Sequence, residues 1–178
     1  MINELYNPYT QTYLDLKRII NAPDFDWHRV GVTIGQPGTP KDHPDFNLFA
    51  HAFLGRPIIE HPFPKVMSQY AELAAKVVAE ILLANDIYPH VIYRISVNCV
   101  VEKEGISPPH VDHEIPHKNL IVYLNTFTGG RTLVLGKDGV QYASKPKEDL
   151  PICFDGELTH CHEAANEGNR LALIATFL

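Results

Sequence analysis

The pattern of hydrophobic and polar positions predicts two helices in the first half of the chain. Thr10 is a suitable N-cap for a helix that runs to about Asn21, and Pro23 ends it. A longer helix is expected from Pro64, which suits a first helical turn, to about Ala84. Its apolar residues recur at three- and four-residue steps and so predict one buried face: Val66, Tyr70, Leu73, Val77 and Ile81.

After Pro89 the pattern changes to short runs rich in β-branched and aromatic residues, bounded by Gly, Pro, Asn or Asp. These runs predict strands at 91–101, 120–127, 132–135, 140–143, 152–154 and 171–177. Residues 26–34 form an earlier strand-like run, and the Pro-rich segment from Gly35 to about Asp45 is typical of a loop. Helices followed by such strands favour helices packed on an antiparallel double sheet. We therefore expect a mainly β protein with N-terminal helices and a double-stranded β-helix core, a cupin-like jelly roll.

Length and composition indicate one globular domain, because 178 residues can bury a core and 45% hydrophobic residues is an ordinary value. We expect helical support over about 1–88 and the β-helix core over about 89–178. The formal net charge of −6 argues against nonspecific nucleic-acid binding. Cys99, Cys153 and Cys161 form no CxxC pair, which favours reduced thiols and a cytoplasmic location. The chain shows no secretory signal and no apolar run near the ~20 residues of a membrane span, so no membrane association is expected.

The candidate chemistry lies in the last third of the chain, where His110-Val111-Asp112 is followed by His160 and Arg170. Two residues at i and i+2 on a strand point to the same side of the sheet, so His110 and Asp112 could share one metal ion. A third ligand from a distant strand would complete a face of two histidines and one carboxylate with open coordination positions. That arrangement is typical of non-haem iron(II) oxygenases. His160, which follows an apolar strand and a turn, is the third candidate ligand.

Each of these ligand assignments has an alternative. His110 could pack against an aromatic ring while Asp112 makes a turn, because an HxD triplet arises easily by chance among ten histidines. A second triplet, His43-Pro44-Asp45, falls in the Pro-rich loop, and we interpret it as surface residues. His162 is an alternative to His160 as the distal ligand.

Arg170 opens the apolar run Leu171–Phe177, and a buried guanidinium is costly unless an anion neutralises it. A bound dicarboxylate is one natural partner, because a guanidinium grips a carboxylate with two parallel hydrogen bonds. The alternative is an internal ion pair with Asp or Glu. The arginine and the open metal face together predict a metal ion and an acidic co-substrate at one site.

Five pieces of residues 91–178 carry a family resemblance: His110-Val111-Asp112, Tyr123-Leu124-Asn125, Gly129-Gly130-Arg131-Thr132, the strand end Phe154–His160, and Arg170. In this order they resemble the Fe(II)/2-oxoglutarate-dependent dioxygenases, in the branch of the prolyl hydroxylases and small viral and bacterial relatives. The resemblance implies a hydroxylase that uses Fe(II), 2-oxoglutarate as co-substrate and O2, and that releases succinate and CO2.

The resemblance also implies roles for individual residues. His110, Asp112 and His160 would be the metal ligands, and no catalytic residue beyond them is implied. His160 is preferred because the eight residues from His162 to Arg170 would be fewer than usual in the family. The co-substrate would be bound by Arg170 at its distal carboxylate, by a hydrogen bond from Tyr123, and by pocket residues Thr132 and Asn98.

The substrate stays open. A peptidyl proline follows from the family branch alone, and a free amino acid, another small molecule or a nucleobase fits the same residues. The alternative function is a cupin-like metal-binding protein or isomerase without oxygenase activity, which leaves Arg170 without a task. A structural zinc site is disfavoured, because structural zinc is normally closed by four ligands.

Overall fold

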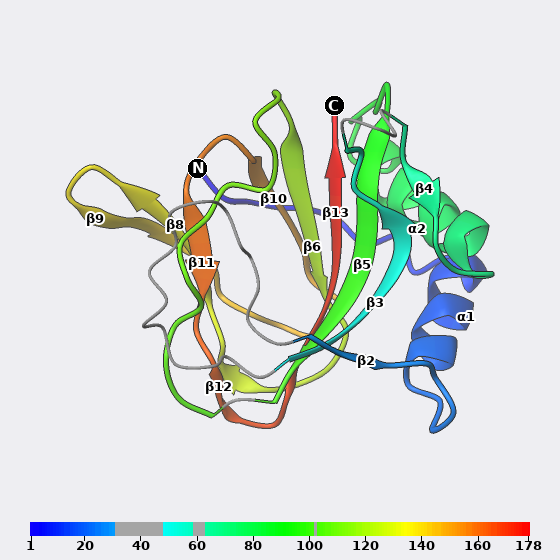
Figure 1. Ribbon diagram of the computed structural model, residues 1–178, viewed down its shortest axis with the longest axis horizontal. Helices are drawn as coiled ribbons and strands as arrows, with labels where there is room; N and C mark the ends of the chain where they lie inside the picture. Colours follow the sequence, from blue (N-terminus) through cyan, green and yellow to red (C-terminus); the bar gives the residue numbers. More distant parts are fainter. Residues whose placement is uncertain (31–47, 59–62, 102) are drawn as a thin grey trace.

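The computed structural model describes residues 1–30, 48–58, 63–101 and 103–178 (Figure 1). These residues form antiparallel sheets of eight, three and two strands, with two helices beside the largest sheet. The predicted mainly β jelly roll with N-terminal helices is confirmed. None of the helices in the described residues is long and apolar enough to cross a membrane.

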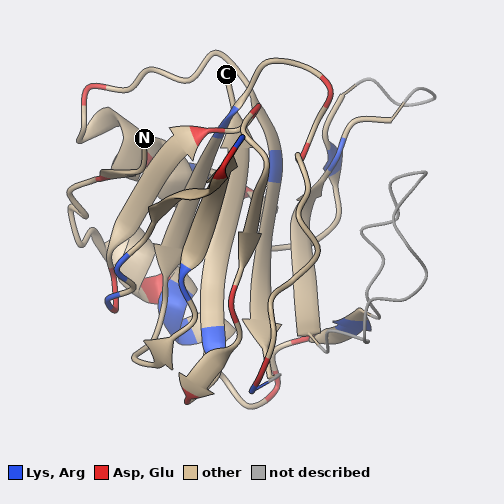
Figure 2. Ribbon diagram, turned by 90° about the vertical axis from the view of Figure 1, so that its left-hand side faces the viewer, with Lys and Arg blue, Asp and Glu red and all other residues tan. Residues whose placement is uncertain are grey.

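The large sheet has the order β1-β10-β6-β13-β5-β3-β2, and β4 pairs with β3. Its strands are β1 (Asn3–Glu4), β2 (His28–Val30), β3 (Leu48–Gly55), β4 (Lys65–Val66), β5 (Ile92–Val100), β6 (Lys118–Tyr123), β10 (Pro151–Asp155) and β13 (Arg170–Phe177). The last strand of the chain is therefore central, paired with β5 on one side and β6 on the other. Figure 2 shows that charged residues lie mostly at strand ends and in connecting segments, as expected for buried strands.

Shorter strands lie across from the large sheet in Figure 1. The three-stranded sheet has the order β11 (His160–His162), β8 (Thr132–Gly136) and β9 (Gly139–Ala143). The two-stranded sheet joins β12 (Ala165–Glu167) to β7 (Thr128–Gly129). These strands form the second layer of the jelly roll.

Alternation along β13 divides the core into two clusters. Leu171, Leu173, Ala175 and Phe177 belong to a cluster with the helices on the outer face of the sheet. Ala172 and Ile174 belong to a cluster between the two layers, with Ile121, Tyr123, Val134, Ile152 and Phe154. Because side chains alternate between faces, Arg170 and Thr176 share the inner face with these two residues. The inner face is where the candidate site lies.

Helix α1 (Gln11–Ile20) confirms the expected first helix, with Thr10 as its N-cap accepting a hydrogen bond from the backbone N–H of Tyr13. Helix α2 (Ala71–Leu83) ends as expected but begins seven residues after Pro64, so that prediction was wrong at its start. Lys65–Val66 instead pairs with β3 as β4, and Val66 is exposed. Pairing with the edge of β3 therefore outweighs the helical spacing of the apolar residues in this segment.

The division into a helical part and a strand part needs a similar correction. Strands β1, β2, β3 and β4 all come from the first 88 residues and join the large sheet, so this part is more than helical support. Of the predicted strand 26–34, His28–Val30 is a strand, and the remainder after Val30 lies outside the described residues. The predicted loop from Gly35, with its His43-Pro44-Asp45 triplet, also lies outside them.

Candidate metal centre and its cavity

His110, Asp112 and His160 come together between the two layers, and one ligand atom from each lies within 4.8 Å of the others. His160 begins β11, and its backbone exchanges two 2.9 Å hydrogen bonds with that of His110 across an isolated bridge. The HxD triplet was expected on a strand. It has only this bridge at His110, while Asp112 lies in a bend that still brings its carboxylate to the same side.

Both histidines of this group are oriented by backbone carbonyls. Nδ1 of His110 lies 3.0 Å from the oxygen of Pro108, and Nδ1 of His160 lies 3.0 Å from that of Leu158. A carbonyl only accepts hydrogen bonds, so each Nδ1 carries the proton and each neutral ring keeps its lone pair on Nε2. A backbone partner of this kind is common for metal-binding histidines.

The electrostatics of the group favour the forms that bind metals. Burial raises the pKa of Asp112, but the close contact with His160 and the charges of Arg94 and Arg56 outweigh burial and hold that pKa well below its usual value. Burial and the neighbouring His160 lower the pKa of His110. An ionised carboxylate and a neutral imidazole are the forms that coordinate a cation, so the donor set fits a divalent metal.

Two arginines hold the far oxygen of the carboxylate. Nη2 of Arg56 lies 2.6 Å and Nη1 of Arg94 lies 3.1 Å from Oδ1 of Asp112, while Oδ2 lies 3.3 Å from Nε2 of His160. Sequence reasoning missed both arginines. Arg94 stands alone in an apolar strand, which is the signal that singled out Arg170, whereas Arg56 follows β3 without any such signal.

The three candidate ligands line a cavity of about 420 Å³. The predicted co-substrate residues Arg170, Thr132 and Asn98 line the same cavity. Asn98 presents a buried side-chain oxygen without a hydrogen-bond partner. Such an atom is normally satisfied in a folded protein, so the cavity offers an acceptor to a bound molecule.

Arg170 is only 2% exposed. Its Nε donates to the carbonyl of Gly130 at 3.0 Å, its Nη2 donates to Oγ1 of Thr132 at 3.0 Å, and its guanidinium lies 5.5 Å from the ring centroid of Tyr123. Gly130 has a φ of +59°, and a Cβ there would lie 2.7 Å from Phe127, so the Gly-Gly turn needs glycine to reach the arginine. Within the described residues, no aspartate or glutamate pairs with Arg170. The internal ion pair weighed as an alternative is therefore not found among them.

Tyr123 is completely buried beneath Arg170, and its hydroxyl contacts Thr132 at 2.9 Å and Ser144 at 2.7 Å. The backbone N–H of Thr132 also donates to Ser144. The tyrosine thus fixes the threonine that holds the guanidinium. Its predicted hydrogen bond to a co-substrate stays a prediction.

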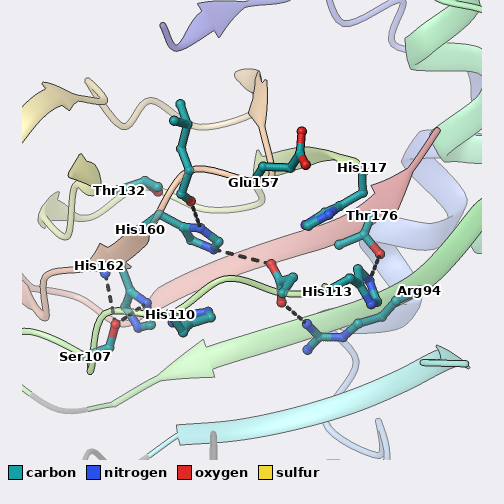
Figure 3. A network of polar contacts seen from close by, with 12 residues as sticks. Arg94, Ser107, His110, His113, His117, Thr132, Glu157, His160, His162 and Thr176 are labelled. Carbon is teal, nitrogen blue, oxygen red and sulfur yellow. Dashed lines mark hydrogen bonds and ion pairs between the residues drawn. The ribbon is translucent and has the colours of Figure 1, made fainter. Parts of the chain in front are cut away.

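His162, the alternative distal ligand, lines the cavity but is not one of the three residues whose ligand atoms cluster. Its Nδ1 lies 3.0 Å from the hydroxyl of Ser107 (Figure 3). Burial and the charge of Arg170 hold the pKa of His162 well below its usual value. The geometry therefore groups His160 with His110 and Asp112.

A scan of protein-family models and a search of curated proteins found no match to this chain. Solved structures do match. An oxidoreductase of the 2OG-Fe(II) oxygenase family from Burkholderia pseudomallei has a TM-score of 0.69 at 13% identity, over 97% of this chain and 80% of its own. The epimerase SnoN, solved with Fe3+, alpha ketoglutarate and nogalamycin RO, has a TM-score of 0.57 at 13% identity, over 99% of this chain and 78% of its own.

A third similar structure is a prolyl hydroxylase from Trichoplax adhaerens in complex with a hypoxia inducible factor peptide fragment. Its TM-score is 0.58 at 12% identity, over 99% of this chain and 83% of its own. At these identities the likeness defines the fold alone. The chain has the fold of the Fe(II)/2-oxoglutarate oxygenases, and the resemblance seen in the sequence is confirmed at that level.

Proposed function

We propose that this protein is an Fe(II)- and 2-oxoglutarate-dependent dioxygenase that hydroxylates its substrate and releases succinate and CO2. The observation that carries the proposal is the meeting of the His110/Asp112/His160 group and the buried Arg170 in one cavity. Two histidines and one carboxylate leave coordination positions open, as an oxygenase needs, whereas a structural zinc site is normally closed. A plain metal-binding cupin would give Arg170 nothing to bind.

The residues divide the work between two ends of the cavity. His110, Asp112 and His160 would hold Fe(II), and Arg170 would bind the distal carboxylate of 2-oxoglutarate through charge-assisted hydrogen bonds. Thr132 and Tyr123 fix the guanidinium, and the side-chain amide of Asn98 contributes a further polar group to the cavity wall. When bound, the iron and the co-substrate supply oxidation by O2, and the protein supplies orientation and a water-poor cavity.

We propose that the substrate is a small molecule or a peptidyl residue such as proline. Among the similar structures, the Trichoplax adhaerens prolyl hydroxylase was solved with a peptide and SnoN with nogalamycin RO, so the fold accepts both kinds of ligand. We also propose that the protein is cytoplasmic, as predicted from the sequence.

The test is an anaerobic titration of the full-length protein with Fe(II) and 2-oxoglutarate. A weak visible charge-transfer band should appear only when both are present, and succinate should be released after air is admitted. Absence of both the band and succinate would contradict the proposal.

A second candidate is an isomerase or epimerase, because SnoN is an alpha-ketoglutarate-dependent epimerase with the same fold. Product mass distinguishes the two functions once a substrate is found. Hydroxylation adds the mass of one oxygen atom, whereas epimerisation leaves the mass unchanged.

A further inference from the structure

The cavity has a second cationic region, formed by Arg56 and Arg94, at the end away from Arg170. Arg94 on β5 is paired with Thr176 on β13, whereas Arg170 begins the same strand opposite Val100. Arg170 and Thr176 are six residue steps apart along the extended strand, roughly 20 Å. Figure 3 shows Arg94 and Thr176 on one side of His160, with Thr132 and His162 on the other.

The charges in this region do not balance. Both guanidiniums contact the same oxygen of Asp112, and within the described residues neither pairs with another carboxylate. All three residues line the cavity, and the side chain of Asp112 is 4% exposed against 19% for Arg94 and 35% for Arg56, so the two cations are more accessible than the carboxylate that they share. Each guanidinium has five N–H donors, and most remain for another acceptor. A metal ion on Asp112 would add more positive charge beside them.

Asn119 adds a neutral polar group to the same end. It lies on β6, where it pairs with Thr176, and it is 1% exposed while lining the cavity. Both its side-chain oxygen and its side-chain nitrogen are buried without a hydrogen-bond partner. A buried amide with neither atom satisfied is costly unless a bound molecule completes it.

We propose that Arg56 and Arg94 form an anion subsite that binds a carboxylate or phosphate group of the substrate, with Asn119 hydrogen-bonding the same molecule. This inference rests on the proposed function and narrows its substrate to a small molecule that carries an oxyanion. Arg170 is occupied by the co-substrate at the far end, so the two cationic regions serve two different anions. Guanidinium groups suit both oxyanions, because each presents oxygens spaced for paired hydrogen bonds.

The experiment uses the full-length protein loaded with Mn2+ and saturating 2-oxoglutarate, and titrates acetate or inorganic phosphate by calorimetry. At least one anion should bind, and Arg56→Gln should weaken it at least ~10-fold, since one charge-assisted contact is lost. Arg56→Lys should recover part of the affinity, because the charge remains but cannot fork. Preference for acetate or for phosphate identifies the group on the substrate. Arg18→Gln, which removes an exposed arginine of α1, is the matched control and should change nothing.

Three results would overturn the subsite. The first is that neither anion binds to the wild type. The second is that the wild type and Arg56→Gln bind the anion with equal affinity. The third is that Arg56→Gln loses affinity only for Mn2+ or 2-oxoglutarate. The last would show that the arginines only position Asp112 or serve the co-substrate. Arg94→Gln, with its melting temperature checked, provides the second variant. Failure of Mn2+ and 2-oxoglutarate to bind the wild type is seen before any anion is added, and it removes the proposed function together with the subsite.

Discussion

At the scale of single residues, the two histidines assigned to the metal differ from their neighbour in what holds the ring. Backbone carbonyls fix the protons of His110 and His160 on Nδ1 and leave Nε2 free to coordinate. His162 contacts a serine hydroxyl, which can donate or accept, so its tautomer is not set by that contact. The sequence distinguished His160 from His162 only by spacing. The structure adds a physical criterion, namely whether a backbone carbonyl fixes the ring proton on Nδ1.

We expect His160→Ala to abolish Fe(II) binding and His162→Ala to leave it within ~3-fold of wild type, because only His160 shares a cluster with the other two ligands. Anaerobic Fe(II) titration measures both affinities, and thermal melting shows whether each variant is folded. The reverse result would move the ligand by two residues while leaving the fold unchanged.

Arg170 should govern the affinity for 2-oxoglutarate and not that for the metal. Arg170→Leu removes a buried charge-assisted pair, so the dissociation constant should rise at least ~100-fold, and Arg170→Lys should rescue only partly. Fe(II) affinity without 2-oxoglutarate should be nearly unchanged. Arg131→Gln, which removes a guanidinium paired with Glu163 on the surface, is the control. If the Leu variant binds 2-oxoglutarate as the wild type does, the arginine has a purely structural role.

At the scale of elements, the sequence predicted those parts whose local pattern agrees with their final environment. Helix α1 has its cap at Thr10, and β5 and β13 are apolar on the face that packs against the helices. The start of α2 was missed because helical spacing at Val66 gave way to pairing with β3. That competition depends on a neighbouring edge that no local pattern reveals.

The residues of the candidate site were likewise predictable where their local sequence pattern is informative. Its ligands and Arg170 stand in short motifs, each next to a strand that could be recognised. Arg56 and Asn119 reach the cavity only because β3 and β6 flank β5 and β13 in the folded sheet. Their place in the cavity depends on which strands are neighbours in the sheet, and the spacing of residues along the chain does not show this.

At the scale of the whole molecule, the cavity and the surface have opposite charge. The chain carries a formal net charge of −6, yet Arg56, Arg94 and Arg170 line the cavity against one described carboxylate, Asp112. A local positive field inside an acidic protein concentrates small anions at the site without attracting polyanions to the surface. This arrangement fits a small anionic co-substrate and a small anionic substrate.

The same cavity should make the metal-free protein sensitive to acid. Burial is the main cause that lowers the pKa of His110 and of His162, and it lowers that of His113, beside His117, to about 4. The unfolded chain, with histidine pKa values near 6.5, therefore binds protons before the folded protein does, and falling pH favours unfolding.

The contribution of the buried histidines to the free energy of unfolding should thus be constant above about pH 7 and should decrease as the pH falls from 6.5 toward 4, and the contribution of Asp112 should be lost in addition below about pH 4. Urea unfolding of the metal-free protein at a series of pH values measures this slope. His113→Gln should make it shallower, because one histidine that must stay neutral in the folded protein is removed. The same change at exposed His90 is the control and should leave the slope as in the wild type. Equal slopes for wild type and His113→Gln would show that His113 does not contribute to the acid sensitivity.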